Sequence, residues 1–132
     1  MRKYLLDSSF VIDLLNEIAG GLTGPALGWL QDNLSARLWI SPVTMAEVLE
    51  GADDPEAVKA YLGRYAWQGI HRAHAEKVAH RQRRASHRMG ENDAWQAAIA
   101  ETMAAIIVAH DTTAFARLGE SYEDHRRAGS RR

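Results

Sequence analysis

Four acidic residues stand at positions where they could hold a divalent cation together. Each lies at the end of a short apolar run or at the start of a helical segment, and the four are Asp7, Glu47, Asp93 and Asp111. Carboxylates that converge on one place cannot all stay ionised unless a positive charge lies between them. Mg²⁺ and Mn²⁺, which prefer oxygen ligands, are the natural counter-charge. The residue types therefore predict a carboxylate site for Mg²⁺ or Mn²⁺.

The elements that must position these acids alternate between strands and helices. Continuous apolar runs predict buried strands at 3–6, 38–40 and 106–109, and a shorter strand is possible at 67–70. Helical patterns separate them at 8–15, 26–34, 42–50, 55–66, 71–89, 94–104 and 112–118. This alternation is typical of a parallel sheet covered on both faces. Ligands of such sheets bind beyond the carboxyl ends of the strands, where all four acids would meet.

Each acid also has an ordinary structural explanation. Asp7, Asp93 and Asp111 all precede helical segments, and an aspartate that caps a helix stabilises it by about 1 kcal/mol. Spacing alone does not separate Asp7 from Asp13. It likewise leaves Glu50 as an alternative to Glu47.

Length and composition predict one soluble domain. The chain has 132 residues, of which 46% are hydrophobic and 25% charged, and it has no cysteine. Disulfide frameworks, zinc–cysteine sites and thiol catalysis are therefore excluded. No apolar run approaches the ~20 residues of a membrane span, and an acid at position 7 argues against a signal peptide. We expect a cytoplasmic protein with a single domain over 1–125 and a basic, flexible tail over 126–132.

The net charge of −1 hides a separation of charge along the chain. Residues 1–63 carry nine acids and four bases, whereas residues 71–88 carry six bases and one acid. Helical spacing places Lys77, Arg81, Arg84 and Arg88 on one face, which we expect to bind a polyanion such as RNA. A different face would pack inward through Ala75, Val78, Ala85 and Met89, with the histidines of this stretch at the surface or in contact with RNA. A solvated helix face without a partner is the alternative interpretation.

Four segments, in order along the chain, resemble the motifs of PIN domains. They are Leu5–Asp13, Ser41–Gly51, Asn92–Ala100 and Val108–Phe115. The motif acids correspond to Asp7, Glu47 rather than Glu50, Asp93 and Asp111. Together the segments extend over about residues 3–118, and the compact length is similar to VapC-type toxins of bacterial toxin–antitoxin pairs.

The resemblance implies a fold and an activity. The fold is a three-layer α/β/α sandwich around a parallel sheet of four to five strands, in agreement with the pattern above. The activity is that of an endoribonuclease dependent on Mg²⁺ or Mn²⁺ and inhibited by a cognate antitoxin, in which water attacks phosphorus and leaves a 5′-phosphate and a 3′-hydroxyl. Asp7 and Asp93 would hold the metal, and Glu47 and Asp111 would complete the acidic cluster. A homodimer is also implied.

Three polar residues beside the acids are candidates to orient the carboxylates, namely Ser9, Asn92 and Thr112. The sequence departs from the family pattern in two places. Ala114 stands where a further acid is frequent, and residues 120–125 are so polar that a fifth strand would be short, at the sheet edge or absent.

Two other functions stay open. One is a housekeeping PIN-type nuclease that processes RNA without an antitoxin, and the other is a non-catalytic module that binds RNA or a partner on the same fold. A phosphotransfer enzyme with Asp7 as nucleophile is disfavoured, because Ser9 stands where such enzymes carry a second aspartate.

Overall fold

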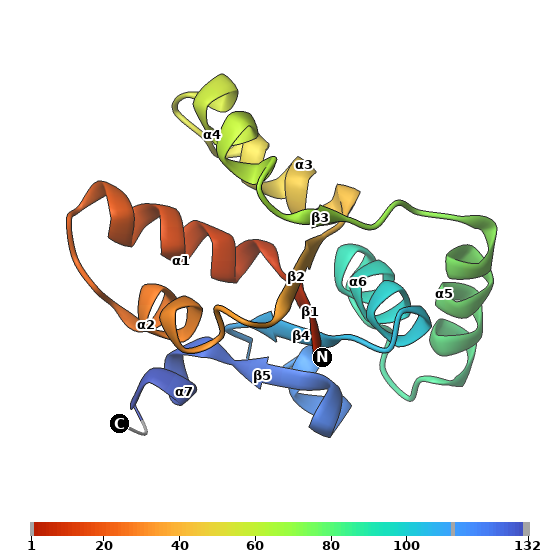
Figure 1. Ribbon diagram of the computed structural model, residues 1–132. Helices are drawn as coiled ribbons and strands as arrows, with labels where there is room; N and C mark the ends of the chain where they lie inside the picture. Colours follow the sequence, from red (N-terminus) through yellow and green to blue (C-terminus); the bar gives the residue numbers. More distant parts are fainter. Residues whose placement is uncertain (1, 112, 131–132) are drawn as a thin grey trace.

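A five-stranded parallel sheet forms the centre of the computed structural model, which describes residues 2–111 and 113–130 (Figure 1). The strands lie in the order β3-β2-β1-β4-β5, and each neighbouring pair is parallel. Their bounds are β1 Lys3–Leu6, β2 Arg37–Ile40, β3 Ala66–Trp67, β4 Ile106–Ala109 and β5 Tyr122–Asp124. The helices are α1 Ser8–Ala19, α2 Pro25–Asp32, α3 Pro42–Glu50, α4 Pro55–Leu62, α5 Arg72–Arg84, α6 Glu91–Thr102, the 3₁₀ segment η1 Phe115–Ser121 and α7 His125–Ser130.

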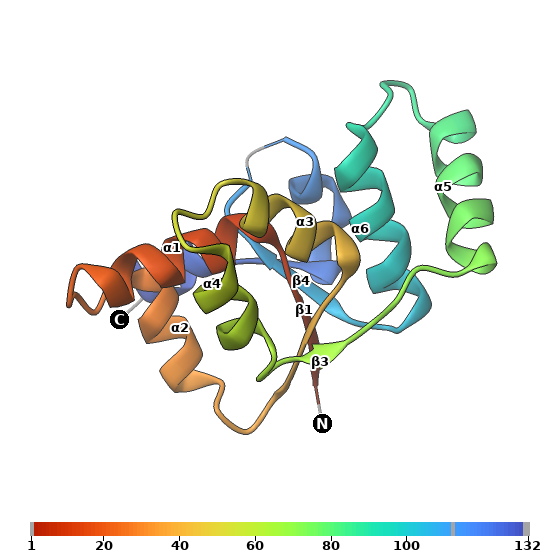
Figure 2. The same ribbon diagram turned by 90° about the horizontal axis from the view of Figure 1, so that it is seen from above.

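Helices cover both faces of this sheet, because successive side chains of a buried strand point to opposite sides. Tyr4 and Leu6 of β1 pack into a core with side chains of α1 to α4, including Phe10 and Trp29. Leu5 packs into a second core on the other face with α6, β4 and η1. Figures 1 and 2 show α1 and α2 on one side of the sheet and α5 and α6 on the other. The three-layer α/β/α fold predicted from the sequence is confirmed.

The order of the strands places β1 at the point where the topology reverses. The chain leaves β1 for β2 on one side and later returns to β4 on the other side. Asp7 directly follows β1, and its backbone N–H donates to the carbonyl of Val108 in β4 at 3.0 Å. The residues after β1 and β4 therefore share the edge of the sheet at which ligands of such folds bind.

The basic helix is shorter than the sequence predicted. A helix over 71–89 was expected, but α5 ends at Arg84 because Ala85 adopts an extended backbone conformation. The chain then turns back toward α6, held by both amide atoms of Gln82. Its Nε2 donates to the carbonyl of Met89 at 2.8 Å, and its Oε1 accepts from the N–H of Met89 at 3.0 Å.

The inward face of α5 also differs from the prediction. Val78 is buried as expected, but Ala75 is exposed and His74, expected at the surface, is 1% exposed. The ring of His74 is fixed because its Nδ1 accepts the backbone N–H of His71 at 2.8 Å. Burial, reinforced by the neighbouring His71, lowers the pKa of His74, so this histidine is a neutral core residue.

The last part of the chain completes the sheet edge and one helical layer. Strand β5 is short and lies at the edge, and its polar side chains have partners: Asp124 faces His110, and Glu123 accepts the indole N–H of Trp29. Residues 126–130, which we assigned to a flexible tail, lie in helix α7 beside α2. Within the described residues, no helix is long and apolar enough to cross a membrane.

Candidate active site

Asp7 is held at the carboxyl end of β1 by three donors. It caps α1 by accepting the backbone N–H of Ser9 at 3.3 Å, and the Ser9 hydroxyl donates to the same oxygen at 2.9 Å. Its other oxygen accepts from Nε2 of Gln96 at 3.3 Å. Burial outweighs these bonds and raises the pKa of Asp7. Asp7 is therefore both a helix cap and a buried acid.

Glu47 is positioned by residues from two other helices. The hydroxyl of Ser8 in α1 donates to Oε1 at 3.0 Å, and the amide of Asn92 in α6 donates to Oε2 at 3.3 Å. These bonds place the carboxylate of Glu47 between α1, α3 and α6. Glu50, the alternative within the same helix, is exposed.

The pKa of Asp93 depends on the charges of the other three acids. Asp93 lies in the first turn of α6, whose N-cap is Gly90, so it is not the helix cap that the sequence suggested as an alternative. Burial, together with the negative charges of Asp7, Asp111 and Glu47, raises the pKa of Asp93 to about 6. Among the described residues, no donor is hydrogen-bonded to its carboxylate. The four predicted acids thus belong to one electrostatic cluster.

Asp111 follows β4 and closes a tight turn. Its carboxylate accepts the backbone N–H of Phe115 and, at 3.4 Å, that of Thr113. The hydroxyl of Tyr122 accepts the Asp111 backbone N–H at 3.0 Å and donates to its carbonyl at 2.7 Å. Asp111 therefore also serves as a turn cap. Thr112, the third residue predicted to orient a carboxylate, lies outside the described residues.

Asp13, the alternative to Asp7, has a different role. Its carboxylate accepts from Nε2 of His125 at 2.8 Å and from Nε of Arg126 at 2.9 Å. These contacts tie α1 to α7.

A buried polar network beneath the site was missed in the sequence. At its centre is Gln96 of α6, whose side chain is 0% exposed and joins three elements. Its Oε1 accepts from the hydroxyl of Ser41 at 2.6 Å, and its Nε2 donates to Oγ1 of Thr44 at 2.8 Å as well as to Asp7. Thr44 in turn donates to the carbonyl of Leu6 at 2.7 Å. A polar residue at an inward position of an otherwise apolar helix was the available signal.

The residues present fit a hard divalent cation, although they do not form a closed coordination shell. Every candidate donor is a carboxylate or neutral oxygen, which suits Mg²⁺ or Mn²⁺. Burial and the negative charges of the other three acids together raise the pKa of Asp93, and a bound cation would offset both effects. Among residues 2–111 and 113–130, no three His, Cys, Asp or Glu side chains are close enough together to hold a metal ion. Water or substrate oxygens would therefore supply part of the coordination.

The predicted RNA-binding cations are only partly available. Lys77 and Arg81 both pair with Glu101 of α6, at 3.4 Å and 2.7 Å. Arg84 contacts Nε2 of His80 at 3.2 Å and has no carboxylate partner within the described part of the chain. Arg88 pairs with Glu91 at 2.9 Å and lies beyond the end of α5, so the prediction of one continuous face through Arg88 is wrong.

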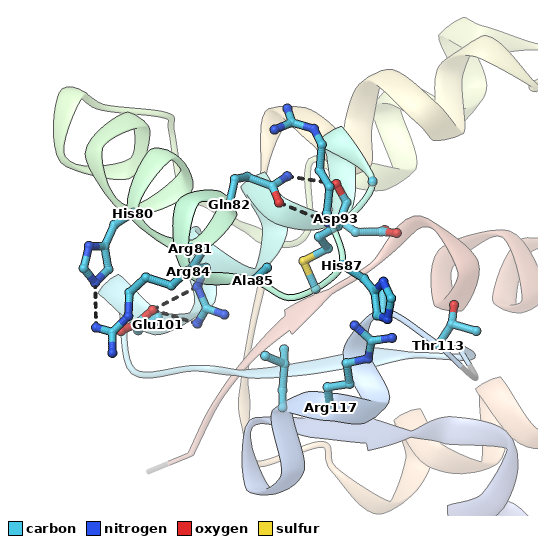
Figure 3. Close-up of a pocket in the computed structure, with 15 residues that line it drawn as sticks. His80, Arg81, Gln82, Arg84, Ala85, His87, Asp93, Glu101, Thr113 and Arg117 are labelled. Atoms are coloured by element: carbon cyan, nitrogen blue, oxygen red, sulfur yellow. Dashed lines mark hydrogen bonds and ion pairs between the residues drawn. The ribbon is translucent and has the colours of Figure 1, made fainter.

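A pocket of about 550 Å³ adjoins the acidic cluster. It lies between the end of α5, the connection to α6, α6 itself and the segment around η1 (Figure 3). Cationic side chains line it, among them Arg84 and Arg117, and Asp93 forms part of its wall. Met89 and Leu118, also in the lining, are partly buried against the second core. A basic pocket and an acidic cluster therefore share Asp93.

The comparison with family models identifies the family to which the chain belongs. Residues 4–121 match the model of the PIN domain, and the chain belongs to this family. PIN domains are generally nucleases, which agrees with a carboxylate cluster at the carboxyl ends of parallel strands. A comparison with curated proteins finds no match.

Solved structures of similar fold come from bacterial toxin–antitoxin systems. One chain of a toxin–antitoxin complex from Klebsiella pneumoniae is 20% identical, with a TM-score of 0.73 over 92% of this chain and 97% of that one. VapBC-1 from nontypeable Haemophilus influenzae is 20% identical, with a TM-score of 0.71 and coverage of 93% and 98%. DNA-bound VapBC from Salmonella typhimurium is 21% identical, with a TM-score of 0.70 and coverage of 95% and 99%. At these identities the likeness shows the fold.

Proposed function

We propose that this protein is a metal-dependent endoribonuclease and the toxin of a toxin–antitoxin pair. The observation that carries the nuclease proposal is the placement of Asp7, Glu47, Asp93 and Asp111 within one cluster, where Gln96 and Asn92 of α6 hold Asp7 and Glu47. Burial, together with the charges of the other three acids, raises the pKa of Asp93 to about 6. Membership of the PIN family and the likeness to chains of toxin–antitoxin complexes support the proposal.

Asp7 and Asp93 would hold Mg²⁺ or Mn²⁺, with Glu47 and Asp111 completing the site directly or through water. A bound ion would lower the pKa of water and balance the charge that develops on the phosphate. Ser9 and Gln96 fix the orientation of Asp7, while Ser8 and Asn92 fix that of Glu47. These bonds would keep the acids in place while substrate binds.

Hydrolysis with water as the nucleophile breaks the bond between phosphorus and the 3′ oxygen. The products would carry a 5′-phosphate and a 3′-hydroxyl. No side chain needs to form a covalent bond to phosphorus, in keeping with a chain that has no cysteine.

RNA would approach along the basic pocket that Asp93 shares. Arg84 and Arg117 line this pocket and have no carboxylate partner among the described residues. A phosphate backbone is attracted to such cations, and its binding would place a phosphodiester beside the acids. Both the RNA and the antitoxin would be met in the cytoplasm.

The antitoxin would cover apolar side chains near the end of α1. Ile18 is 48% exposed and Leu22, which follows the helix, is 67% exposed. Large apolar side chains that gather at a surface are typical of protein-binding sites. A homodimer is part of the same proposal, and light scattering on the purified protein would measure it.

The first experiment compares the wild type with Asp7→Asn on mixed RNA, in Mg²⁺, in Mn²⁺ and in EDTA. We expect cleavage by the wild type in metal only, and a loss of at least about 100-fold in Asp7→Asn, because both a metal ligand and a buried charge are removed. Asp53→Asn changes an exposed acid outside the cluster and should cleave like the wild type. Circular dichroism checks that each variant is folded.

Two results would contradict the proposal. Equal cleavage by the wild type and Asp7→Asn would mean that a contaminant cuts the RNA or that Asp7 serves only as a helix cap. No cleavage by folded wild type in either metal, while RNA is still bound, would favour a non-catalytic RNA-binding module.

A further inference from the structure

We propose that Tyr122 of β5 is a positioning residue that fixes Asp111, the fourth acid of the cluster, for metal binding. This inference rests on the proposed function and adds the edge strand β5 to the active site. The Tyr122 hydroxyl accepts the backbone N–H of Asp111 at 3.0 Å and donates to the backbone carbonyl of the same residue at 2.7 Å. One side chain therefore holds both polar groups of the Asp111 main chain.

Asp111 needs this partner because it lies beyond the end of the sheet ladder. Strand β5 runs beside β4 at the sheet edge (Figure 1), and the two strands pair from Ile107 with Tyr122 to Ala109 with Asp124. Asp111 follows two residues after the last pair and is half-buried. Backbone polar groups that lose contact with water require hydrogen-bond partners. The Tyr122 hydroxyl thus does for Asp111 what a neighbouring strand does for the residues of β4.

The carboxylate of Asp111 is held from within its own turn. In the described part of the chain, its hydrogen bonds come from Phe115 and Thr113. These bonds fix the carboxylate relative to the turn, but they do not fix the turn relative to the sheet. Tyr122 supplies that connection, because it belongs to a strand that is paired with β4. The distance from the Asp111 carboxylate to the other acids therefore depends on Tyr122.

A second hydroxyl ties the preceding residue to Asp7. The Ser9 hydroxyl accepts the backbone N–H of His110 at 3.0 Å and donates to the Asp7 carboxylate at 2.9 Å. The end of β4 is thus held from α1 by Ser9 and from β5 by Tyr122. Without the Tyr122 hydroxyl, Asp111 itself would lose its connection to β5 while His110 kept its bond to α1.

The ring of Tyr122 is held independently of its hydroxyl. It is partly buried against the second core, and its centre lies 6.3 Å from that of the Phe115 ring. Tyr122→Phe would keep this packing and remove the hydroxyl alone. The variant therefore separates a positioning role from a role in the core.

The test measures Mn²⁺ binding in the absence of RNA, by electron paramagnetic resonance of the free ion. We expect Tyr122→Phe to weaken Mn²⁺ binding about tenfold, the lower end of what the loss of a partner to a metal ligand commonly costs. Tyr61→Phe is the matched control, because the Tyr61 hydroxyl pairs with that of Tyr65 at 2.6 Å rather than with an acid of the cluster. This control should bind Mn²⁺ like the wild type.

A double-mutant cycle tests whether Tyr122 acts through Asp111. Effects of residues that act through one contact do not add. In an Asp111→Asn background, Tyr122→Phe should therefore weaken Mn²⁺ binding by less than about twofold. A tenfold loss in both backgrounds would overturn the inference, because Tyr122 would then act on another part of the site.

Amide hydrogen exchange, followed by nuclear magnetic resonance on the metal-free protein, measures the hydrogen bond itself. Exchange at Asp111 should accelerate about fivefold in Tyr122→Phe, as the loss of one hydrogen bond implies. Exchange at Asp7, whose N–H donates to the carbonyl of Val108 at 3.0 Å, should not change. Unchanged exchange at Asp111 would also overturn the inference.

The two proposals can fail separately. If Tyr122→Phe binds Mn²⁺ like the wild type and cleavage still requires Asp7, the nuclease stands and the positioning role is wrong. If Tyr122→Phe loses Mn²⁺ affinity and the wild type cleaves no RNA, the positioning role stands and the nuclease is wrong. A folded wild type that binds no Mn²⁺ would overturn both.

Discussion

At the scale of single residues, Gln96 is the side chain whose role is least visible in the sequence. It is fully buried and donates to both Asp7 and Thr44 while accepting from Ser41. The bond to Asp7 lowers the pKa of that carboxyl against the effect of burial. Gln96 is therefore a positioning residue for Asp7, the proposed metal ligand.

Gln96→Leu should weaken Mn²⁺ binding by about tenfold or more, since partners of metal ligands commonly contribute this much. Isothermal titration of folded protein measures the affinity. Thr102→Val removes another side-chain hydrogen bond of α6, to the carbonyl of Ala98 at 2.8 Å, and serves as the control for stability. If both variants bind Mn²⁺ equally well, Gln96 supports only the fold.

The raised pKa of Asp93 predicts how the metal-free protein responds to pH. The unfolded acid ionises near its ordinary value of 3.8, whereas the folded protein retains the proton until about pH 6. Between these values the folded state binds more protons, so its stability falls as pH rises. In EDTA, Asp93→Asn should therefore stabilise the fold at pH 7.5, by about 1 kcal/mol after allowance for solvent screening. Thermal melts at pH 7.5 and pH 4 measure the difference in stability between Asp93→Asn and the wild type. This difference should vanish at pH 4.

At the scale of elements, the contact between α1 and α7 holds the end of the chain in place. Asp13 of α1 accepts from His125, which is 0% exposed, and from Arg126. Burial opposes the charge on Asp13, but the hydrogen bonds from Arg126 and His125 outweigh it and lower the pKa of this acid. The polar segment that follows β5 is thus anchored to the first helix.

Arg126→Gln should destabilise the protein by about 1 kcal/mol at pH 7, as expected for a partly exposed ion pair. A depressed carboxyl pKa stabilises the fold above the pKa of the unfolded acid, and this stabilisation is lost as pH falls through the folded value. Urea denaturation at pH 7 and pH 3 measures the difference. Arg83→Gln is the control. If Arg126→Gln lowers the free energy of unfolding equally at both pH values, the ion pair is not the cause.

At the scale of the whole molecule, two exposed apolar side chains near the end of α1 lie outside the basic pocket. Ile18 and Leu22 line neither the pocket nor a described core. The proposed antitoxin would cover this apolar area at the end of α1 that is remote from Asp7.

Ile18→Ser combined with Leu22→Ser should weaken antitoxin binding about tenfold and leave RNA cleavage intact, because loss of buried apolar area affects the partner only. Biolayer interferometry with the antitoxin, once a partner has been co-purified with the wild type, measures the affinity. Leu34→Ser, at a side chain that is 77% exposed, is the matched control. Equal affinity in the double variant and the control would place the antitoxin elsewhere.

The sequence by itself determined the order of the elements and the position of the four acids along them. Apolar runs predict buried strands, and the carboxyl ends of parallel strands must meet at one edge, so Asp7 and Asp111 could be placed together without coordinates. Tertiary structure decided which side chains act as partners. Gln96 bonds to Asp7, Glu101 neutralises Arg81, and His74 is buried, because these outcomes depend on how α5 and α6 pack. Local patterns reflect the backbone, whereas contacts between distant residues depend on packing that no local pattern records.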